Sequence, residues 1–261
     1  MIEVRNLSFS YKNQPVFNDL SFQLNDFSMA ALLGLNGEGK TTLIKLMLGL
    51  LKPDNGEILI NGKDIHKISE NARSKLLSYV PQEMDSALSM TVSDFICMGA
   101  MNRQNIFSGP KEKDRRQAAD ILLNLDISDL EHSDINRLSS GQRRMAYLAR
   151  TIFQNSDILI MDEPVNSLDY LKQHRFLSTL KNYIMNNDRK VIMSIHDPSL
   201  AYQYADTFLF FKDHGLSGIL SRKDHDFEEA MCRNVSFIYD GKVDVSILNN
   251  QLLINIKTNN G

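Results

Sequence analysis

The chain has little cysteine, which argues against a disulfide framework or a thiol metal site. Its two cysteines, Cys97 and Cys232, lie far apart among 261 residues, and neither belongs to a Cys-x-x-Cys or His-rich pattern. Isolated thiols of this kind are typical of reduced, buried side chains in a cytoplasmic protein. We therefore expect neither cysteine to have a metal or redox role.

An excess of positive charge is also missing. The formal net charge is -3, and the sequence contains no long block of Lys and Arg. Proteins that bind nucleic acid usually carry a basic patch that neutralises phosphates. We therefore expect no nucleic-acid partner.

Long apolar runs are absent as well. The nearest to one, residues 43–51, is interrupted by Lys45 and falls short of the roughly 18 residues that span a bilayer. The first residues, MIEVRNLSFSY, lack the basic and apolar regions of a signal peptide, so we expect that the protein is not exported. No internal repeat, low-complexity segment or heptad run is present either. Any role at a membrane must then depend on a partner protein.

What the chain does contain is enough apolar sequence, 43%, to build a sizeable core. Near the start, apolar residues alternate with polar ones and predict an antiparallel sheet. They are Ile2, Val4, Leu7, Phe9, Tyr11, Leu20, Phe22 and Leu24. Three continuous apolar runs, 29–33, 158–161 and 191–195, instead predict parallel strands that are covered on both faces. Asn61-Gly62 predicts a tight turn between two strands.

Two other regions have patterns of their own. Residues from about 85 to 138 have helical spacing, with Thr91 or Ser93 as candidate caps and a stretch over 111–125 that is charged first and then apolar. This pattern predicts an inserted helical subdomain. After Lys212 the pattern is less regular. Apolar residues on both sides of Asp240-Gly241 predict a hairpin there, which a third strand over 252–256 would extend. The residues of the two predicted hairpin strands are Val235, Phe237, Tyr239, Val243, Val245 and Ile247.

The strongest chemical motif is GLNGEGKT, residues 34–41, between an apolar strand and a helix-spaced run. It fits the phosphate-loop pattern G-x-x-x-x-G-K-[ST]. Glycines let backbone N–H groups curl around phosphates, Lys40 neutralises the β and γ oxygens, and the Thr41 hydroxyl can bind Mg²⁺. The structural alternative is a glycine turn with a solvated lysine.

A second motif is the acidic pair that ends the apolar run 158–161. Asp162 and Glu163 stand at the carboxyl end of a buried strand, where open α/β sheets bind ligands. In phosphate-loop ATPases such an Asp holds the Mg²⁺ shell, and the next acid is placed to polarise the attacking water. Without the phosphate loop, the pair could simply be two solvated acids.

The third motif, LSSGQ at residues 138–142, opens a predicted helix. Ser139 and Ser140 are candidate N-caps, and Gly141 permits close approach of another backbone or ligand. Apolar residues on one face of the helix predict that this face is buried against the rest of the protein. They are Met145, Leu148, Ala149, Ile152 and Phe153. By itself this could be a capped helix that binds nothing.

In this order and spacing, the three motifs resemble those of the ATP-binding cassette (ABC) family over about residues 1–213. The resemblance implies an α/β fold with a phosphate-loop NTPase core and a parallel sheet. It also implies an N-terminal antiparallel β-subdomain and a helical subdomain inserted at about 85–140. Residues 214–261 would form a small β-rich tail outside the family domain.

The resemblance also implies a role for each matching residue, and ATP and Mg²⁺ as cofactors. Residues for ATP binding are Tyr11, Gly34, Leu35, Asn36, Gly37, Glu38, Gly39, Lys40, Thr41 and Thr42, with Tyr11 stacking on adenine. Residues for catalysis are Lys40, Gln82, Glu163 and His196. Residues for Mg²⁺ are Thr41, Gln82 and Asp162. The signature, Ser139, Ser140, Gly141 and Gln142, would close over ATP held by another copy, and Asp169 in the Ser167-Leu168-Asp169 loop would cross that dimer interface.

Within the family, residues 90–114 and 135–173 look most like ATPase subunits of importers for ferric siderophores, haem and cobalamin. This implies Mg-dependent ATP hydrolysis coupled to import, with multi-span permease subunits as direct partners and a substrate-binding protein as an indirect one. The chain would lie at the cytoplasmic face of the cell membrane as a peripheral protein. Two departures from the family pattern are Ser140, in place of glycine, and Val165-Asn166, in place of threonine and serine; we expect activity to survive the serine.

Two other functions remain open from the sequence. One is a soluble ABC ATPase that acts in regulation or assembly without a permease. The other is a nucleotide-binding module that does not hydrolyse ATP, against which the intact Lys40, Asp162, Glu163 and His196 argue. Chromosome-organising and DNA-repair cassettes would need long coiled-coil insertions, and translation-factor cassettes normally carry two copies in one chain.

Overall fold

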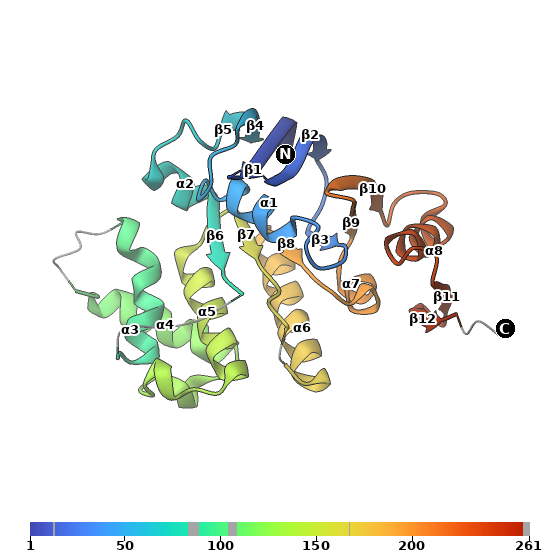
Figure 1. The fold of residues 1–261 in the computed structure, drawn as a ribbon. Coiled ribbons are helices and arrows are strands. Elements are labelled where there is room, and N and C mark those ends of the chain that lie inside the picture. The colour runs from blue at the N-terminus through green and yellow to red at the C-terminus, as the bar shows by residue number, and fades with distance from the viewer. Residues whose placement is uncertain (13, 83–88, 104–108, 167, 258–261) are drawn as a thin grey trace. The chain divides into compact units, whose positions relative to one another are not determined.

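A computed structural model describes residues 1–12, 14–82, 89–103, 109–166 and 168–257. The chain forms two compact units, the first from Met1–Ile68 and Lys190–Gly261 and the second from Ser69–Arg189. Figure 1 labels their helices and strands. Two limits stay predictions: those of the helical subdomain, at about 85–140, and the boundary between the family domain, which would end at 213, and the tail, which would begin at 214.

The first unit contains the predicted antiparallel sheet. Its strand order is β2-β1-β4-β5, with β1 at Ile2–Tyr11, β2 at Gln14–Leu24, β4 at Asn55–Ile60 and β5 at Lys63–Asp64. Apolar side chains pair across β1 and β2, as in Val4 with Phe22 and Leu7 with Leu20. Asn61 and Gly62 both have positive φ, 49° and 75°, which confirms the tight turn between β4 and β5.

The same unit holds the parallel strands that position the phosphate loop. Strand β3 (Met29–Leu33) pairs in parallel with β8 (Lys190–Ser194) on one side and β9 (Thr207–Lys212) on the other. Strand β10 (Gly215–Ser221) is antiparallel to β9. Every residue of β3 is buried, as expected for a strand covered on both faces. Helices α1 (Lys40–Met47) and α7 (Pro198–Tyr204) follow β3 and β8.

The C-terminal part of this unit corrects one prediction. Residues Phe227–Ile238 form helix α8, and the hairpin lies further on, between β11 (Val243–Leu248) and β12 (Gln251–Ile256). The apparent alternation at 235–239 was misleading because the residues that α8 buries, such as Val235 and Ile238, are three apart, whereas Phe237 is 50% exposed. The hairpin turns at Asn249 and Asn250, both with positive φ.

The second unit contains a short parallel pair, β6 (Leu77–Val80) and β7 (Ile158–Met161), and most of the helices. Its helices are α2 (Glu70–Leu76), α3 (Val92–Cys97), α4 (Glu112–Asn124), α5 (Ser140–Gln154) and α6 (Tyr170–Asn187), with 3-10 turns at Met98–Arg103, Ser128–Leu130 and Ile135–Arg137. Helices α3, α4 and α5 pack on one another.

Helical structure in this region was predicted, and the described residues confirm it. Of the two candidate caps, Thr91 is the N-cap of α3 and accepts a hydrogen bond from the Asp94 amide at 3.1 Å. Ser93 is buried inside the helix. The other parts of the predicted subdomain, 85–88 and 104–108, lie outside the described residues. In the part of the chain that the structure describes, no helix combines the length and the hydrophobicity needed to cross a bilayer.

Candidate nucleotide-binding site

The predicted phosphate loop connects β3 to α1 in the first unit. Gly37 and Gly39 have φ of 89° and 87°, a left-handed conformation that glycine adopts without strain. Gly39 is the N-cap of α1, so no side chain caps the helix, and its first turn contains no acidic residue. The first N–H groups of a helix have no partner within the helix and attract anions. This loop therefore has the chemistry of a phosphate site.

Lys40 is folded over the same loop. Its side chain is buried, with the residue 5% exposed, and Nζ donates hydrogen bonds of 2.7 Å to the carbonyl oxygens of Gly34 and Leu35. Neighbouring strands hold the loop tightly, because a Cβ on Gly39 would lie 2.6 Å from the Phe17 ring. The loop thus combines a fixed backbone with one ammonium group, and this combination fits the phosphates of a nucleotide.

Two other predicted residues lie in this unit. Tyr11 ends β1, packs edge-to-face against Phe9 and is 41% exposed, so part of this residue is accessible from solvent. His196 is exposed and follows the buried end of β8. Because β3 and β8 are parallel, with Leu32 beside Ser194, their carboxyl ends meet at one edge of the sheet. His196 and the phosphate loop therefore share that edge.

In the second unit, the acidic pair follows β7. Asp162 and Glu163 are 1% and 9% exposed. Strand β6 runs parallel to β7 and brings Gln82 to the same edge. Gln82 Nε2 donates to Glu163 Oε2 at 2.7 Å. Sequence predicted these residues separately, and the structure brings Gln82 and Glu163 into contact.

Two residues around Glu163 were missed as site residues. Asn166 Nδ2 donates to Glu163 Oε2 at 2.9 Å, and Arg144 Nη1 donates to the Glu163 carbonyl oxygen at 3.0 Å. Burial lowers the pKa of Arg144, and the charge of Glu163 opposes that change. Burial, together with the charge of Asp162, raises the pKa of Tyr79 to about 12, so this phenol stays neutral beside the pair. The sequence singles out Asn166 only as a departure from the family pattern, and no sequence pattern indicates that Arg144 contacts Glu163.

The signature residues begin α5 as predicted. Ser139 is the N-cap: its Oγ accepts from the Gln142 amide at 3.4 Å, and Gln142 Oε1 accepts from the Ser139 amide at 3.0 Å. This reciprocal pair is a capping box. Ser140 is the first residue of the helix. Of the predicted apolar face, Leu148, Ala149 and Phe153 are buried.

The start of α6 covers the signature glycine. A Cβ on Gly141 would lie 3.2 Å from Lys172 Cδ and 3.4 Å from Leu168 Cδ2. Asp169 caps α6 by accepting from the Lys172 amide at 3.0 Å, and its carboxylate pairs with Lys172 Nζ at 2.5 Å. A cavity of about 220 Å³ adjoins these groups, and its lining includes Ser139, Gly141 and Lys172. Ser167, predicted in the dimer loop, lies outside the described residues.

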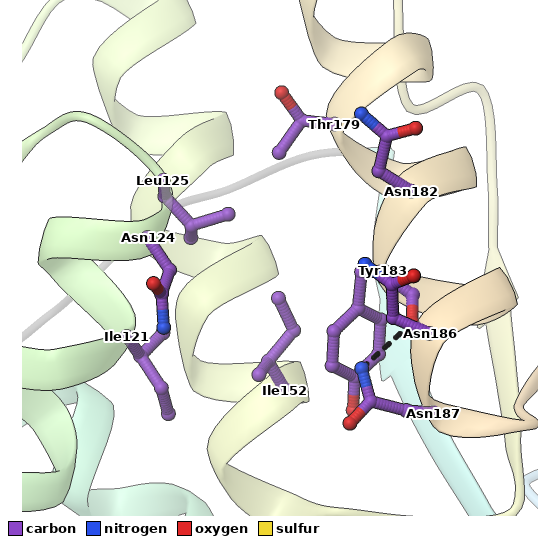
Figure 2. Close-up of a pocket in the computed structure, with 9 residues that line it drawn as sticks. All are labelled: Ile121, Asn124, Leu125, Ile152, Thr179, Asn182, Tyr183, Asn186 and Asn187. Atoms are coloured by element: carbon purple, nitrogen blue, oxygen red, sulfur yellow. Dashed lines mark hydrogen bonds between the residues drawn. The ribbon is translucent and has the colours of Figure 1, made fainter.

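A larger cavity, of about 380 Å³, lies between α4, α5 and α6 (Figure 2). Figure 2 shows side-chain amides on two of its sides, with Ile121 and Leu125 beside Asn124 on one side and Ile152 between the two sides. The amides belong to Asn124, Asn182, Asn186 and Asn187. None of the predicted nucleotide residues lines this cavity.

The predicted Mg²⁺ site uses a mixed set of oxygen donors. The described residues contain no cluster of three or more His, Cys, Asp or Glu that could hold a metal. The predicted Mg²⁺ ligands are the Thr41 hydroxyl in the first unit and the Gln82 amide and Asp162 carboxylate in the second. Mg²⁺ takes oxygen ligands, usually only one or two of them carboxylates, together with nucleotide phosphates. The donor types present fit that ion.

Comparison with known proteins gives the same family. The family model described as "ABC transporter" matches residues 17–166. A probable iron chelatin transport ATP-binding protein of Helicobacter pylori strain 26695 is 35% identical over 259 residues, covering 97% of this chain and 98% of the relative.

Two solved structures have the same fold. One, described as a metal-chelate type ABC transporter in an inward-facing conformation, has a TM-score of 0.79 and 25% identity, and the match covers 98% of this chain and 96% of that one. The other, a bacterial ABC transporter cassette solved as a dimer, has a TM-score of 0.76 at 20% identity and covers 86% of this chain and all of its own (100%). With its phosphate loop, its acidic pair and its signature helix, the chain belongs to the ABC transporter family and is one of its ATP-binding, ATP-hydrolysing subunits.

Proposed function

We propose that this chain energises an ABC importer whose cargo is an iron chelate, such as a siderophore or haem, or a cobalamin-type molecule. The observation that carries the proposal is the match along almost the whole chain to a relative named for iron chelatin transport. The similarity to a metal-chelate type transporter supports the same class of cargo. The cargo would be held by partner proteins rather than by this chain.

In the first unit, we assign nucleotide binding to the phosphate loop, residues 34–42, with Tyr11 against the adenine. Lys40 would exchange its two carbonyl partners for the β and γ oxygens of ATP. His196, at the same sheet edge, would contact the γ-phosphate. Each of these groups supplies a positive charge, an N–H donor or an aromatic face to an anionic ligand.

In the second unit, we assign the general base to Glu163. Its carboxylate accepts from Gln82 and Asn166, which fix its orientation toward a water molecule. Mg²⁺ would be held by Thr41, Gln82 and Asp162, and when bound it neutralises phosphate charge. Phosphoryl transfer needs mainly this positioning and charge neutralisation.

We further propose that two copies form the active ATPase. In such a dimer, Ser139, Ser140, Gly141 and Gln142 of one copy would close over the ATP held by the Lys40 of the other, with Asp169 at the interface. A cassette of the same fold has been solved as a dimer. Hydrolysis would then depend on dimer closure, which supplies a mechanical stroke.

The stroke would act on multi-span permease subunits, and through them on a substrate-binding protein. The chain would then lie on the cytoplasmic face of the cell membrane as a peripheral subunit. The described helices cannot cross a bilayer, so attachment would rest on the permease. A soluble regulatory or assembly ATPase is less well supported, because the relative that matches along the full chain is named for transport.

Uptake of iron chelate by cells that depend on this chain tests the proposal. Cells carrying Lys40→Ala or Glu163→Gln should lose uptake, because the first variant weakens ATP binding and the second blocks hydrolysis. Lys257→Met serves as a matched control, since Lys257 is exposed and pairs only loosely with Asp244 at 3.7 Å. Unchanged uptake in both site variants, at normal protein levels, would rule out the importer role.

A further inference from the structure

Glu38 is an unusual neighbour for phosphates, because its carboxylate brings negative charge into a loop that binds anions. The structure shows where this charge is directed. Glu38 Oε2 accepts a hydrogen bond of 2.9 Å from the backbone N–H of His214. His214 belongs to the two-residue turn between β9 and β10, in which Asp213 and His214 both have positive φ, 52° and 60°. The carboxylate thus ties the phosphate loop to this turn.

The same hairpin holds the beginning of the loop. A Cβ on Gly34 would lie 2.6 Å from the carbonyl oxygen of Phe211, so β9 is in close contact with the loop where the loop leaves β3. The β9–β10 hairpin therefore fixes the phosphate loop at two points, Gly34 and Glu38. The backbone N–H groups between these points are those that the proposed function assigns to the phosphates.

The C-terminal tail, residues 227–257, holds the hairpin in turn. Lys212, the residue before the turn, donates from Nζ to the Phe237 carbonyl oxygen at 2.7 Å and pairs with Asp240 at 2.9 Å. Its ammonium group also lies 4.1 Å from the centre of the Phe237 ring. The side chain of Lys212 is only 16% exposed, whereas that of Asp240 is 51% exposed, so the lysine is largely covered by its partners.

Other contacts fix the tail on the same unit. Helix α8 packs closely on β10, since a Cβ on Gly218 would lie 2.9 Å from Asn234 Oδ1. The guanidinium group of Arg222 lies over the rings of Tyr202, Phe208 and Phe227. The tail is thus a packed part of the first unit, and Lys212 is its direct link to the turn.

We infer that the C-terminal tail positions the phosphate loop for ATP through Lys212, the Asp213-His214 turn and Glu38. Glu38 and Lys212 are positioning residues, which act on ATP affinity through the loop backbone. This inference rests on the proposed role of residues 34–42 in ATP binding. It gives residues 227–257, which are part of the predicted tail 214–261 whose function the sequence left open, a defined effect on the family activity.

Titration of the purified full chain with the fluorescent analogue N-methylanthraniloyl-ATP tests the inference. Glu38→Ala removes the acceptor and should weaken binding by about tenfold, the effect of a hydrogen bond to a charged group. Glu38→Gln keeps an acceptor oxygen and should weaken binding less than Glu38→Ala. Lys212→Met should weaken binding by about threefold, and Lys257→Met, in the same tail, should have no effect.

Two further measurements separate positioning from general damage. The double variant Glu38→Ala/Lys212→Met should bind no more weakly than Glu38→Ala alone, because both changes interrupt one path. In ATPase assays, KM should rise in Glu38→Ala and Lys212→Met while kcat at saturating ATP stays within about twofold.

The outcomes distinguish this inference from the proposed function. Unchanged binding in Lys40→Ala would refute the phosphate loop as the ATP site. Lost binding in Lys40→Ala, with unchanged binding in Lys212→Met, would refute only the role of the tail. If Glu38→Gln and Glu38→Ala both tightened binding, repulsion between the carboxylate and phosphate would dominate and the positioning role would be wrong.

Discussion

At the scale of single residues, Glu163 is central to the proposed hydrolysis of ATP. Its carboxylate has two amide donors, Gln82 and Asn166, and a third donor, Arg144, bonds to its backbone oxygen. Its own φ is 47°, which is uncommon for a residue with a long side chain. A residue held this firmly in a rare conformation is suited to orient one water molecule.

Glu163→Gln should reduce kcat by about 10² or more while the affinity for ATP stays close to wild type. The amide keeps the shape of the side chain but cannot take a proton from water. Steady-state ATPase assays and nucleotide titration on the same preparation measure both values. Retained hydrolysis at the wild-type rate would remove Glu163 from the role of base.

Asn166→Leu should lower kcat by about tenfold with little change in KM for ATP, because the variant removes one of the two donors that orient Glu163. Asn166→Asp would place a second carboxylate beside Glu163 and should be more harmful than leucine. The same steady-state ATPase assay measures kcat and KM for both Asn166 variants. If Asn166→Leu and Asn166→Asp had the same kcat, the Asn166 amide would not be needed to orient the Glu163 carboxylate.

Glu163 itself could be predicted from the sequence, but not all of the side chains that contact it. The acidic pair could be predicted because it directly follows an apolar strand, which is a local pattern. Arg144 reaches Glu163 only because α5 packs near the end of β7, and that contact between distant segments has no local pattern. The contact between Gln82 and Glu163 could be predicted only with knowledge of the sheet, because it depends on β6 and β7 being parallel neighbours.

At the scale of elements, local patterns predicted strands better than the final helix. The tight turn at Asn61-Gly62 was predicted correctly because both residues favour positive φ. For 235–239, alternation over a few residues could not be told from one face of a helix. Glu228 and Glu229 in the first turn of α8 were the missed signal, since acidic residues favour helix starts.

The thiol of Cys97, at the end of α3, gives a prediction about pH. Burial raises the pKa of Cys97 to about 11 from its ordinary value of 9.0, so the folded protein keeps this proton after the unfolded chain has lost it. The stability it contributes is complete below pH 9 and is lost as pH rises toward 11.

Between pH 8 and 10, the free energy of unfolding should therefore fall by about 1 kcal/mol more in wild type than in Cys97→Ala. Urea denaturation at the two pH values measures the difference. Equal losses in both proteins would mean that Cys97 is not protected from ionisation by the fold.

At the scale of the whole molecule, the family and its α/β core could be predicted because the order of three short motifs identifies them. The division into Met1–Ile68 with Lys190–Gly261 and Ser69–Arg189 was not predicted, since it depends on contacts between distant segments. The amide-lined cavity between α4, α5 and α6 (Figure 2) was also missed, because its residues come from separate helices.

For two copies together, we propose that each chain carries halves of two different ATP sites. Its phosphate loop would bind one nucleotide, and the start of its signature helix would serve the nucleotide of another copy. A single chain would then be an incomplete ATPase, and ATP would act as the link between two copies.

Light scattering of the Glu163→Gln variant, with and without ATP and Mg²⁺, tests this claim most directly. Because the variant cannot hydrolyse ATP, we expect the nucleotide to convert the monomer to a dimer. Adding Ser139→Arg should abolish the dimer while leaving ATP binding at Lys40 intact. A mass that stays monomeric at saturating ATP, or a dimer that survives Ser139→Arg, would contradict the shared sites.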